Sequence, residues 1–322
     1  MDLPVPIARR DALAGGFTDR ELHGVAWQRV RRGSYVTAAS GQAVSAEHQH
    51  LMLTHAVAGA SSAEAVVSHV SAAIVHELSC WALSLGRVHL TRARRSGGRV
   101  TRQVALHSMR IDPDEIVRVG GLRVTSVART VIDLARSVPF EQAVVVGDHA
   151  LHSGKTTRDE LLAELARSAG RPGNPAARRV VAFLDGRSES VGESRSRVAL
   201  RAAHFPEPTL QAQITTATGK IVARVDFLFP ELGVIGEFDG LVKYRGARVG
   251  DRPPEDVVIA EKAREDTLRA LGWLVVRWTW RDLDSPHNWF ARLTRAAEIG
   301  RRTERTGGWH VCTDPPYSSQ QV

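Results

Sequence analysis

The chain has 322 residues, which is long enough for two or three domains that each bury a hydrophobic core. Its 43 lysines and arginines outnumber its 35 aspartates and glutamates, and the net charge of +8 favours nucleic acid as a partner over an anionic membrane surface, although basic soluble proteins can share this balance. Two distant cysteines, no signal peptide and no membrane-length apolar run predict a reduced, cytoplasmic protein with no membrane partner.

The first predicted module consists of two short helices and a basic hairpin. The spacing of Thr18 and Glu21 is that of a capping box, which predicts a second helix that extends to about Ala26. The next segment, 27–36, predicts a hairpin that turns at Gly33. This order is typical of a winged helix-turn-helix, whose second helix enters the DNA major groove, but a small helical cap would also produce it. The side chains expected to face DNA are Arg20, His23, Gln28, Arg29, Arg31 and Arg32.

Residues 46–170 mix predicted helices and strands. Six arginines and no acidic residue occur between Arg87 and Arg102, among β-forming residues that a Gly-Gly pair divides. This pattern predicts a hairpin with one arginine-rich face. Contact of Arg94 and Arg95 with DNA phosphates would explain it, and so would a solvated sheet edge that charge protects from aggregation.

Two features lie near the end of this region. The segment 121–135 predicts a strand and then an amphipathic helix that Thr125 or Ser126 caps, an arrangement typical of a scaffold. The segment 168–175 contains two glycines and two prolines, which indicate a break between domains. A separate C-terminal domain is therefore expected after it.

Beyond this break the predicted order is helix, three strands, helix, strand and helix, followed by a flexible tail. The predicted bounds are helix 190–204, strands 210–215, 221–230 and 234–239, helix 255–271, strand 273–280 and helix 289–303. The tryptophans of the last strand alternate as core residues do, so we expect them to pack in the core rather than to stack on DNA bases.

Two of these strands carry acidic residues inside apolar segments. Asp226 interrupts the first, and Glu237 and Asp239 share one face of the second because they are two residues apart. An ionised carboxylate without a partner in an apolar sheet costs several kcal/mol, so these groups should be paired, hydrogen-bonded or holding a metal ion. Adjacent strands lie roughly 4.8 Å apart, so their carboxylates can converge on one hard divalent cation.

An αβββαβ order with acids at these positions resembles the PD-(D/E)xK nuclease superfamily, and most closely its very-short-patch-repair-like endonuclease branch. The matching segments lie within 188–285 and are ESRSR with Glu193, VDFLFPE with Asp226, GEFDG with Glu237 and Asp239, and EKAREDTLRALGWLVVRWTWRDL. The preceding region is similar, through SHVSAAIVHEL and GLRVTSVARTVIDLA, to AbiEi-type antitoxin modules of actinobacterial proteins, which begin with a winged helix.

Together these likenesses imply a multidomain chain of the α+β and α/β classes, in which the N-terminal module guides a nuclease-type domain to DNA. The implied domains are a winged helix-turn-helix at 1–45, a mixed α/β middle domain at 46–170, a linker at 171–187, a restriction-endonuclease-like αβββαβ domain at 188–303 and a flexible tail at 304–322.

The nuclease resemblance implies hydrolysis of DNA phosphodiester bonds with magnesium or manganese. Asp226 and Glu237 would hold the metal ion, Asp239 would complete its shell, and Glu193 would add a nearby contact. Two of these residues also have structural explanations. Glu193 lies three residues after Ser190 and can complete a capping box, and Asp239 precedes a glycine and can belong to a turn.

The resemblance departs at the catalytic lysine, which normally lies two residues after the second acid. Asp239 occupies that position, and a carboxylate adds negative charge where a lysine would offset it. Lys243, Lys262 and Arg277 are candidate replacements, although the two lysines also fit as ordinary solvent-facing side chains.

Two functions follow from the resemblance. The first is a magnesium-dependent DNA endonuclease. The second is a transcriptional autorepressor or antitoxin of a type IV toxin-antitoxin-like system, in which the nuclease fold is inactive. The acids favour the enzyme, and the missing lysine favours the regulator. A toxin or a methyltransferase encoded nearby is a possible further partner.

Overall fold

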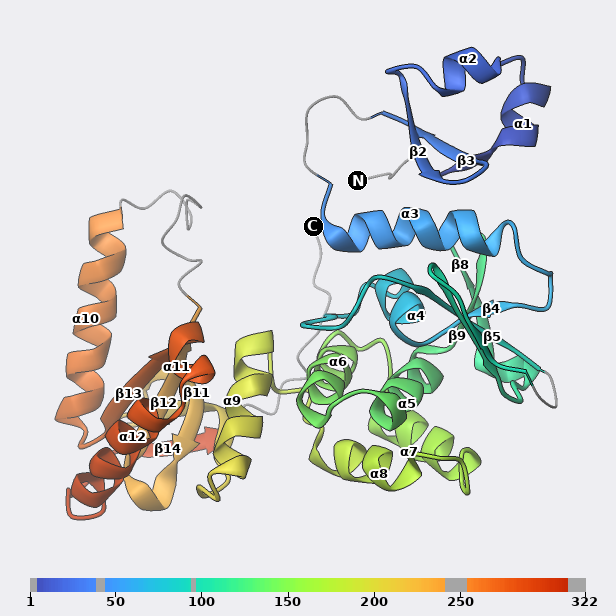
Figure 1. Ribbon diagram of the computed structural model, residues 1–322. Helices are drawn as coiled ribbons and strands as arrows, with labels where there is room; N and C mark the ends of the chain where they lie inside the picture. Colours follow the sequence, from blue (N-terminus) through green and yellow to red (C-terminus); the bar gives the residue numbers. More distant parts are fainter. Residues whose placement is uncertain (1–4, 39–43, 94–96, 241–253, 312–322) are drawn as a thin grey trace. The chain divides into compact units, whose positions relative to one another are not determined.

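The computed structural model describes residues 5–38, 44–93, 97–240 and 254–311 (Figure 1). The chain divides into two compact units, one formed by 1–151 with 155–184 and the other by 152–154 with 185–322. Within the described residues, three sheets and the helices packed on them make a mixed α/β protein, as the sequence predicts. None of the described helices is both long and apolar enough to cross a membrane.

The first unit begins with a small sheet and two short helices. The elements are β1 (Ile7–Ala8), α1 (Arg9–Ala14), α2 (Asp19–Leu22), β2 (Trp27–Arg31) and β3 (Ser34–Thr37). The strand order is β1-β3-β2, and Ala12, Leu22 and Tyr35 form the buried core. The predicted capping box is present: the Thr18 hydroxyl accepts a hydrogen bond from the backbone N–H of Glu21, and the Glu21 carboxylate accepts one from the backbone N–H of Thr18.

Helix α2 is shorter than predicted, because it ends before Gly24 rather than near Ala26. The backbone N–H of Gly24 donates to the carbonyl of Glu21, and that of Trp27 donates to the carbonyl of Gly24. These two tight turns lead directly into β2, and a glycine at this point disfavours continuation of the helix. The hairpin turns at Gly33, which has a φ of 78°, as predicted.

The rest of the first unit is built on a six-stranded mixed sheet. Its elements are α3 (Ala46–Ala58), β4 (Val66–Val67), α4 (His69–Val75), β5 (Val88–Arg92), β6 (Arg99–Val100), β7 (Val104–Ser108), η1 (Pro113–Glu115), β8 (Ile116–Val119), β9 (Leu122–Thr125), α5 (Val127–Ser137), α6 (Phe140–His152), α7 (Arg158–Arg167) and α8 (Asn174–Phe183). The strand order is β6-β7-β5-β4-β9-β8. Ser126 caps α5 by accepting a hydrogen bond from the backbone N–H of Arg129, in agreement with the predicted strand and capped helix.

The arginine-rich segment does not form the predicted hairpin. Strand β5 pairs in parallel with β7, and β6 pairs with β7 in the antiparallel direction, so that β7 lies between them. The cause is burial: Val88 and Leu90 of β5 belong to the hydrophobic core, so β5 takes an interior place in the sheet between β4 and β7. Arg94 and Arg95 lie outside the described residues.

Most of the predicted linker, 171–187, is helix α8, which packs against α5 and α7 in the first unit. Gly173 precedes the helix with a left-handed φ of 82°, and a Cβ atom there would overlap the carbonyl of Arg136. Pro175 lies in the first turn, where proline is tolerated because its missing N–H would have no helical partner. Glycine and proline thus mark the start of a helix here, and the boundary between the units falls after Leu184.

The second unit is a five-stranded sheet with helices on both faces (Figure 1). Its elements are α9 (Val191–Ala202), β10 (Thr209–Thr215), β11 (Ile221–Phe229), η2 (Pro230–Leu232), β12 (Val234–Asp239), α10 (Pro254–Ala270), β13 (Leu274–Thr279), α11 (Trp280–Asp284), α12 (His287–Gly300) and β14 (Gly308–Val311). The strand order is β13-β12-β11-β10-β14, in which only the β12–β13 pair is parallel. Helices α9 and α12 cover one face and α10 covers the other.

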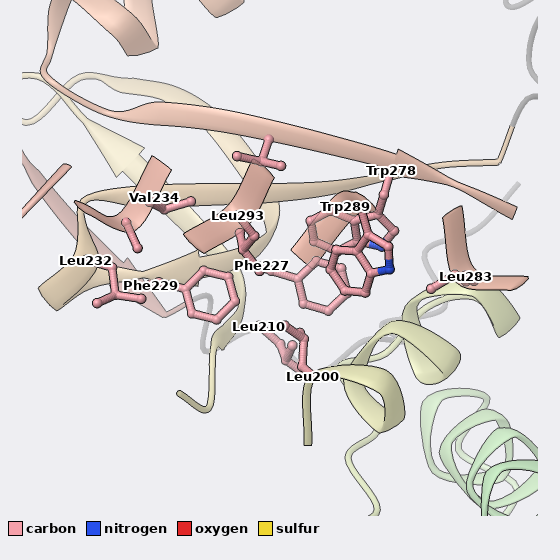
Figure 2. Close-up of a cluster of buried hydrophobic side chains, with 12 residues drawn as sticks. Leu200, Leu210, Phe227, Phe229, Leu232, Val234, Trp278, Leu283, Trp289 and Leu293 are labelled. Atoms are coloured by element: carbon pink, nitrogen blue, oxygen red, sulfur yellow. The ribbon is translucent and has the colours of Figure 1, made fainter. Parts of the chain in front are cut away.

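The core beneath α9 and α12 is built around tryptophans, as the alternation predicts (Figure 2). Trp278 and Trp289 are fully buried, and their rings stack with centroids 4.6 Å apart. The Trp278 indole N–H donates to the hydroxyl of Ser196 on α9 at 2.7 Å, so its polar atom is satisfied. This core fixes α9 and α12 against the sheet, and therefore fixes the end of α9 that carries Glu193.

The predicted flexible tail contains an ordered strand. Residues Gly308–Val311 form β14, which pairs with β10 and places Trp309 opposite Ile214. Gly307, with a φ of 92°, lies against the carbonyl of Thr215, where a Cβ atom would overlap. Because Gly307 has no Cβ atom, the two backbones can approach this closely.

Candidate functional site

Asp226 lies where strand β11 changes the face on which its side chains pack. Val225 belongs to the hydrophobic cluster beneath α10, whereas Phe227, two residues later, belongs to the cluster beneath α9 and α12. In a regular strand these two residues would share a face. The pairing with β10 leaves Gln211 opposite Asp226, and Gln211 has a left-handed φ of 53°. This irregularity explains how an acid can stand inside an apolar strand.

The side chain of Asp226 connects β11 with β12. Its Oδ2 accepts a hydrogen bond from the backbone N–H of Phe238 at 2.9 Å. The backbone pairing of these strands ends at Phe227, which lies opposite Gly236, so the next position places Asp226 opposite Glu237. The two acids therefore occupy facing positions on adjacent antiparallel strands.

Glu237 is buried, with 9% of its surface exposed, and both of its carboxylate oxygens accept hydrogen bonds from arginines. Its Oε2 accepts from Nε of Arg277 at 3.0 Å, and Arg277 is its register partner on the parallel strand β13. Its Oε1 accepts from Nη2 of Arg264 on α10 at 2.8 Å. Two guanidinium groups thus offset the cost of burying this carboxylate.

Two glutamates of α10 extend this ion-pair network. Glu261 contacts Arg264 at 2.8 Å and also contacts Arg277, which lies 3.1 Å from Glu265. Burial by itself would lower the pKa of both guanidinium groups, but the surrounding carboxylates outweigh it and raise the pKa of each. Both arginines therefore stay charged.

Glu193, at the start of α9, has a capping role that differs from the predicted capping box: its backbone N–H donates to the hydroxyl of Ser190, the N-cap residue, while its carboxylate reaches the backbone N–H one residue earlier. Its carboxylate accepts hydrogen bonds from the hydroxyl of Ser190 at 2.7 Å and from the backbone N–H of Glu189 at 3.0 Å. It also accepts one from the side-chain amide of Gln211 at 2.9 Å. Glu193 is buried, and Gln211, to which it is bonded, lies opposite Asp226 in the pairing of β10 with β11.

The candidate cations differ in position. Lys262 is exposed on α10, whereas Glu261 and Arg264 on the same helix contact side chains of the sheet. Lys243 lies outside the described residues. Asp239, in the usual lysine position, is half-buried at the end of β12. Arg277 is the predicted candidate that lies in direct contact with an acid of the site.

Four participants were not predicted from the sequence: Gln211, Glu261, Arg264 and Glu265. The i, i+3 spacing of Glu261 and Arg264 indicates a helix-surface ion pair, but it does not say that the pair faces Glu237. Gln211 stands between two buried apolar residues, Leu210 and Ala212, and this polar position between apolar neighbours was the available signal.

The predicted DNA-facing residues of the N-terminal module divide into two groups. The side chain of Arg31 is half-buried, and its Nη1 donates to the carbonyl of Ala56 in α3 at 3.4 Å, so it has a contact within the unit. The Nδ1 atom of His23 lies 2.7 Å from the carbonyl of Asp19. The exposed residues of the set are Arg20, His23, Gln28, Arg29 and Arg32.

Comparison with known proteins gives a partial match. No protein-family model matches the chain. The chain is similar to uncharacterized protein MT2308 of Mycobacterium tuberculosis strain CDC 1551 / Oshkosh and to uncharacterized protein Rv2248 of strain ATCC 25618 / H37Rv. Each is 33% identical over 159 residues, which cover 49% of this chain and 55% of the relative. The chain thus spans about half the length of the curated relatives that it matches.

Proposed function

We propose that this chain is a DNA-binding protein whose second unit is a nuclease-type domain that hydrolyses DNA phosphodiester bonds with a divalent metal ion. The observation that carries this proposal is the facing pair of acids on β11 and β12, Asp226 and Glu237. Glu193 is hydrogen-bonded to Gln211, the residue opposite Asp226 on β10. The motifs that resemble PD-(D/E)xK nucleases supply these same acids, and the order of elements in the second unit agrees with that resemblance.

A hard divalent cation prefers carboxylate oxygens, which Asp226 and Glu237 offer. These two residues would hold it, and Glu193 is the further acid that the resemblance implies. A bound magnesium or manganese ion would polarise a phosphoryl oxygen and activate the attacking water. The arginines on Glu237 would have to share that carboxylate with the ion, so metal binding competes with an existing ion pair.

Arg277 is the residue proposed to act in place of the absent lysine. A guanidinium group is permanently charged and can bind phosphate oxygens through two parallel hydrogen bonds. Arg277 is already held beside Glu237 by its position on β13 and by contacts with Glu261 and Glu265. It would offset negative charge on the phosphate but, unlike lysine, it would not exchange a proton.

The N-terminal module is proposed to bring duplex DNA to the protein. Arg20 lies on α2, and Arg29 and Arg32 lie on the hairpin, and all three are exposed. Because α2 is a single helical turn, the hairpin arginines are proposed to contact mainly the DNA phosphates. In this proposal the N-terminal module is a winged helix-turn-helix of the AbiEi antitoxin type.

A second function has one specific observation in its favour. Both oxygens of Glu237 are engaged by arginines, and a carboxylate, Asp239, stands where the lysine is expected. A domain of this kind could bind DNA without cutting it, and the chain would then act as a transcriptional autorepressor or antitoxin with a toxin as its partner.

The two functions are separated by incubating the purified protein with supercoiled and linear DNA in magnesium or manganese. Nicking that is absent in Asp226→Ala and retained in Asp266→Ala, an exposed acid on α10, supports the nuclease. DNA that is bound but not cleaved in the presence of either metal supports the autorepressor or antitoxin function.

A further inference from the structure

Three histidines come together in the first unit. His69 is the first residue of α4, His89 lies in β5 and His107 lies in β7. One potential ligand atom from each lies within 4.8 Å of those of the other two. The Nδ1 atom of His89 is 3.0 Å from Nε2 of His107, and the ring of His69 stacks on that of His107 with centroids 3.8 Å apart.

The fold explains why two of these residues meet. Strands β5 and β7 are parallel, with His89 opposite Ala105 and Thr91 opposite His107. His107 therefore lies two residues beyond the partner of His89, which puts both rings on the same face of the sheet. Their neighbours on β5, Val88 and Leu90, point into the hydrophobic core on the other face.

His69 reaches the cluster through an unusual backbone. Its φ of 51° lies in the left-handed region, which is uncommon for residues other than glycine, although histidine adopts it more often than most. Such strain persists where the surroundings require it and often marks a functional position. The Nδ1 atom of His69 is 3.0 Å from the hydroxyl of Ser68, which itself accepts a hydrogen bond from Thr91 at 2.8 Å. This anchor leaves Nε2 of His69 as its ligand atom.

The surroundings of the cluster favour neutral rings. Burial, followed by the neighbouring histidines, lowers the pKa of His69 well below its usual value, and the same causes lower the pKa of His89 to about 4. Nearby Arg129 pairs with Asp133 and Glu115, and Arg136 pairs with Asp133, and the positive charge of these two arginines further lowers the pKa of His69. Neutral imidazole is the form that binds metal ions.

We propose that His69, His89 and His107 bind one transition-metal ion of the zinc class. Imidazole nitrogens suit zinc, cobalt, nickel and copper, whereas magnesium prefers oxygen ligands, so this site would be chemically distinct from the carboxylates of the second unit. Around tetrahedral zinc the ligand nitrogens lie about 3.3 Å apart, as follows from zinc–nitrogen distances near 2.0 Å. The His89–His107 separation is already close to this spacing, and rotation of the His69 ring out of its stack would complete the set.

The proposal is independent of the nuclease assignment and is tested by metal binding. Untagged full-length protein, stripped of metal with a chelator, is titrated with Zn²⁺ against a chromophoric zinc indicator and with Co²⁺, whose absorption reports ligand type and geometry. We expect one tight site per chain, a tetrahedral nitrogen-ligand cobalt spectrum and a higher Tm with Zn²⁺, because an ion that binds only the folded chain stabilises it. Excess Mg²⁺ should not displace the ion.

Variants assign the site. His89→Gln and His107→Gln should each weaken zinc binding at least a hundredfold, whereas His48→Gln, at an exposed position on α3, should leave it unchanged. Circular dichroism and thermal unfolding in chelator check that the glutamine variants fold like the wild type. The inference is overturned if the wild type binds no zinc, or if the His89→Gln/His107→Gln double variant binds it as tightly as the wild type. The three rings would then form only a neutral hydrogen-bonded cluster.

Discussion

The carboxylate of Asp226 accepts a hydrogen bond from the backbone N–H of Phe238, 2.9 Å away on the neighbouring strand. This contact continues the connection between β11 and β12 one position past the end of their backbone pairing. It gives Asp226 a structural role in addition to the proposed metal-binding role. The two roles can be separated, because the hydrogen bond needs only an oxygen acceptor, whereas the metal site needs the negative charge.

We therefore predict different outcomes for two substitutions at Asp226. Asp226→Asn keeps an acceptor for the Phe238 N–H and should leave stability nearly unchanged, while Asp226→Ala leaves that N–H without its partner and should cost about 1–3 kcal/mol. Both should abolish magnesium-dependent cleavage. Urea unfolding measures the first effect and a nicking assay the second. Equal stability of the two variants would show that the hydrogen bond does not support the strands.

The second prediction concerns Arg277. Arg277→Ala should lower the cleavage rate about a hundredfold, because removal of one positive group that stabilises the transition state typically has an effect of this size. DNA affinity should change little. Arg269→Ala, which removes an exposed guanidinium group that pairs with Glu265 on α10, is the matched control and should cleave at the wild-type rate. Wild-type cleavage by Arg277→Ala would exclude the proposed lysine replacement.

The third prediction concerns DNA binding by the hairpin. Replacing Arg29 and Arg32 with alanine should weaken binding to all duplex sequences about equally. The slope of log K against log salt concentration should fall in magnitude by roughly 1–2, because binding releases fewer counterions when phosphate contacts are lost. The double variant Arg178→Ala/Arg179→Ala removes two exposed arginines of α8 and controls for net charge. Fluorescence anisotropy at several salt concentrations gives both quantities. An equal loss in the control pair would point to a general charge effect instead of a hairpin contact.

The fourth prediction is a pH dependence in the first unit. Burial, together with the adjacent Glu115, raises the pKa of Glu164 from 4.5 to about 7. The folded state therefore holds a proton that the unfolded state releases, so this group's contribution to stability is greatest below pH 4.5 and is lost as pH rises toward 7. Glu164→Gln should remove this fall and be more stable than the wild type at pH 8. Unfolding free energies measured from pH 5 to pH 8 test this, and an unchanged slope in Glu164→Gln would contradict it.

The sequence predicted most of the second unit because its signals are local. Strands such as Val234–Asp239 are apolar, β-branched runs bounded by glycine and proline, and their bounds agree with the structure. The facing positions of Asp226 and Glu237 follow from a hairpin between two such strands. The arginines on Glu237 could not be predicted in the same way, because Arg264 reaches it only through the packing of α10 on the sheet.

The errors have the same origin. The predicted hairpin between Arg87 and Arg102 was wrong, because the buried strand β5 does not pair with β6, the next strand in the chain. It pairs instead with β7, which follows β6. The predicted linker was wrong because Gly173 and Pro175 mark the start of a packed helix as readily as a loop. In each case long-range packing decided between two structures that the local sequence allowed.

The most direct measurement is single-turnover cleavage of an end-labelled duplex by the full chain, with excess protein and with magnesium or manganese. Wild type, Asp226→Asn, Glu237→Gln and the exposed control Asp266→Ala are purified in the same way and compared. We expect wild type and Asp266→Ala to yield metal-dependent products with hydrolysed phosphodiester ends, and the other two to yield none. Duplex that stays bound but intact with wild-type protein in both metals would contradict the nuclease assignment and leave the chain as a DNA-binding regulator.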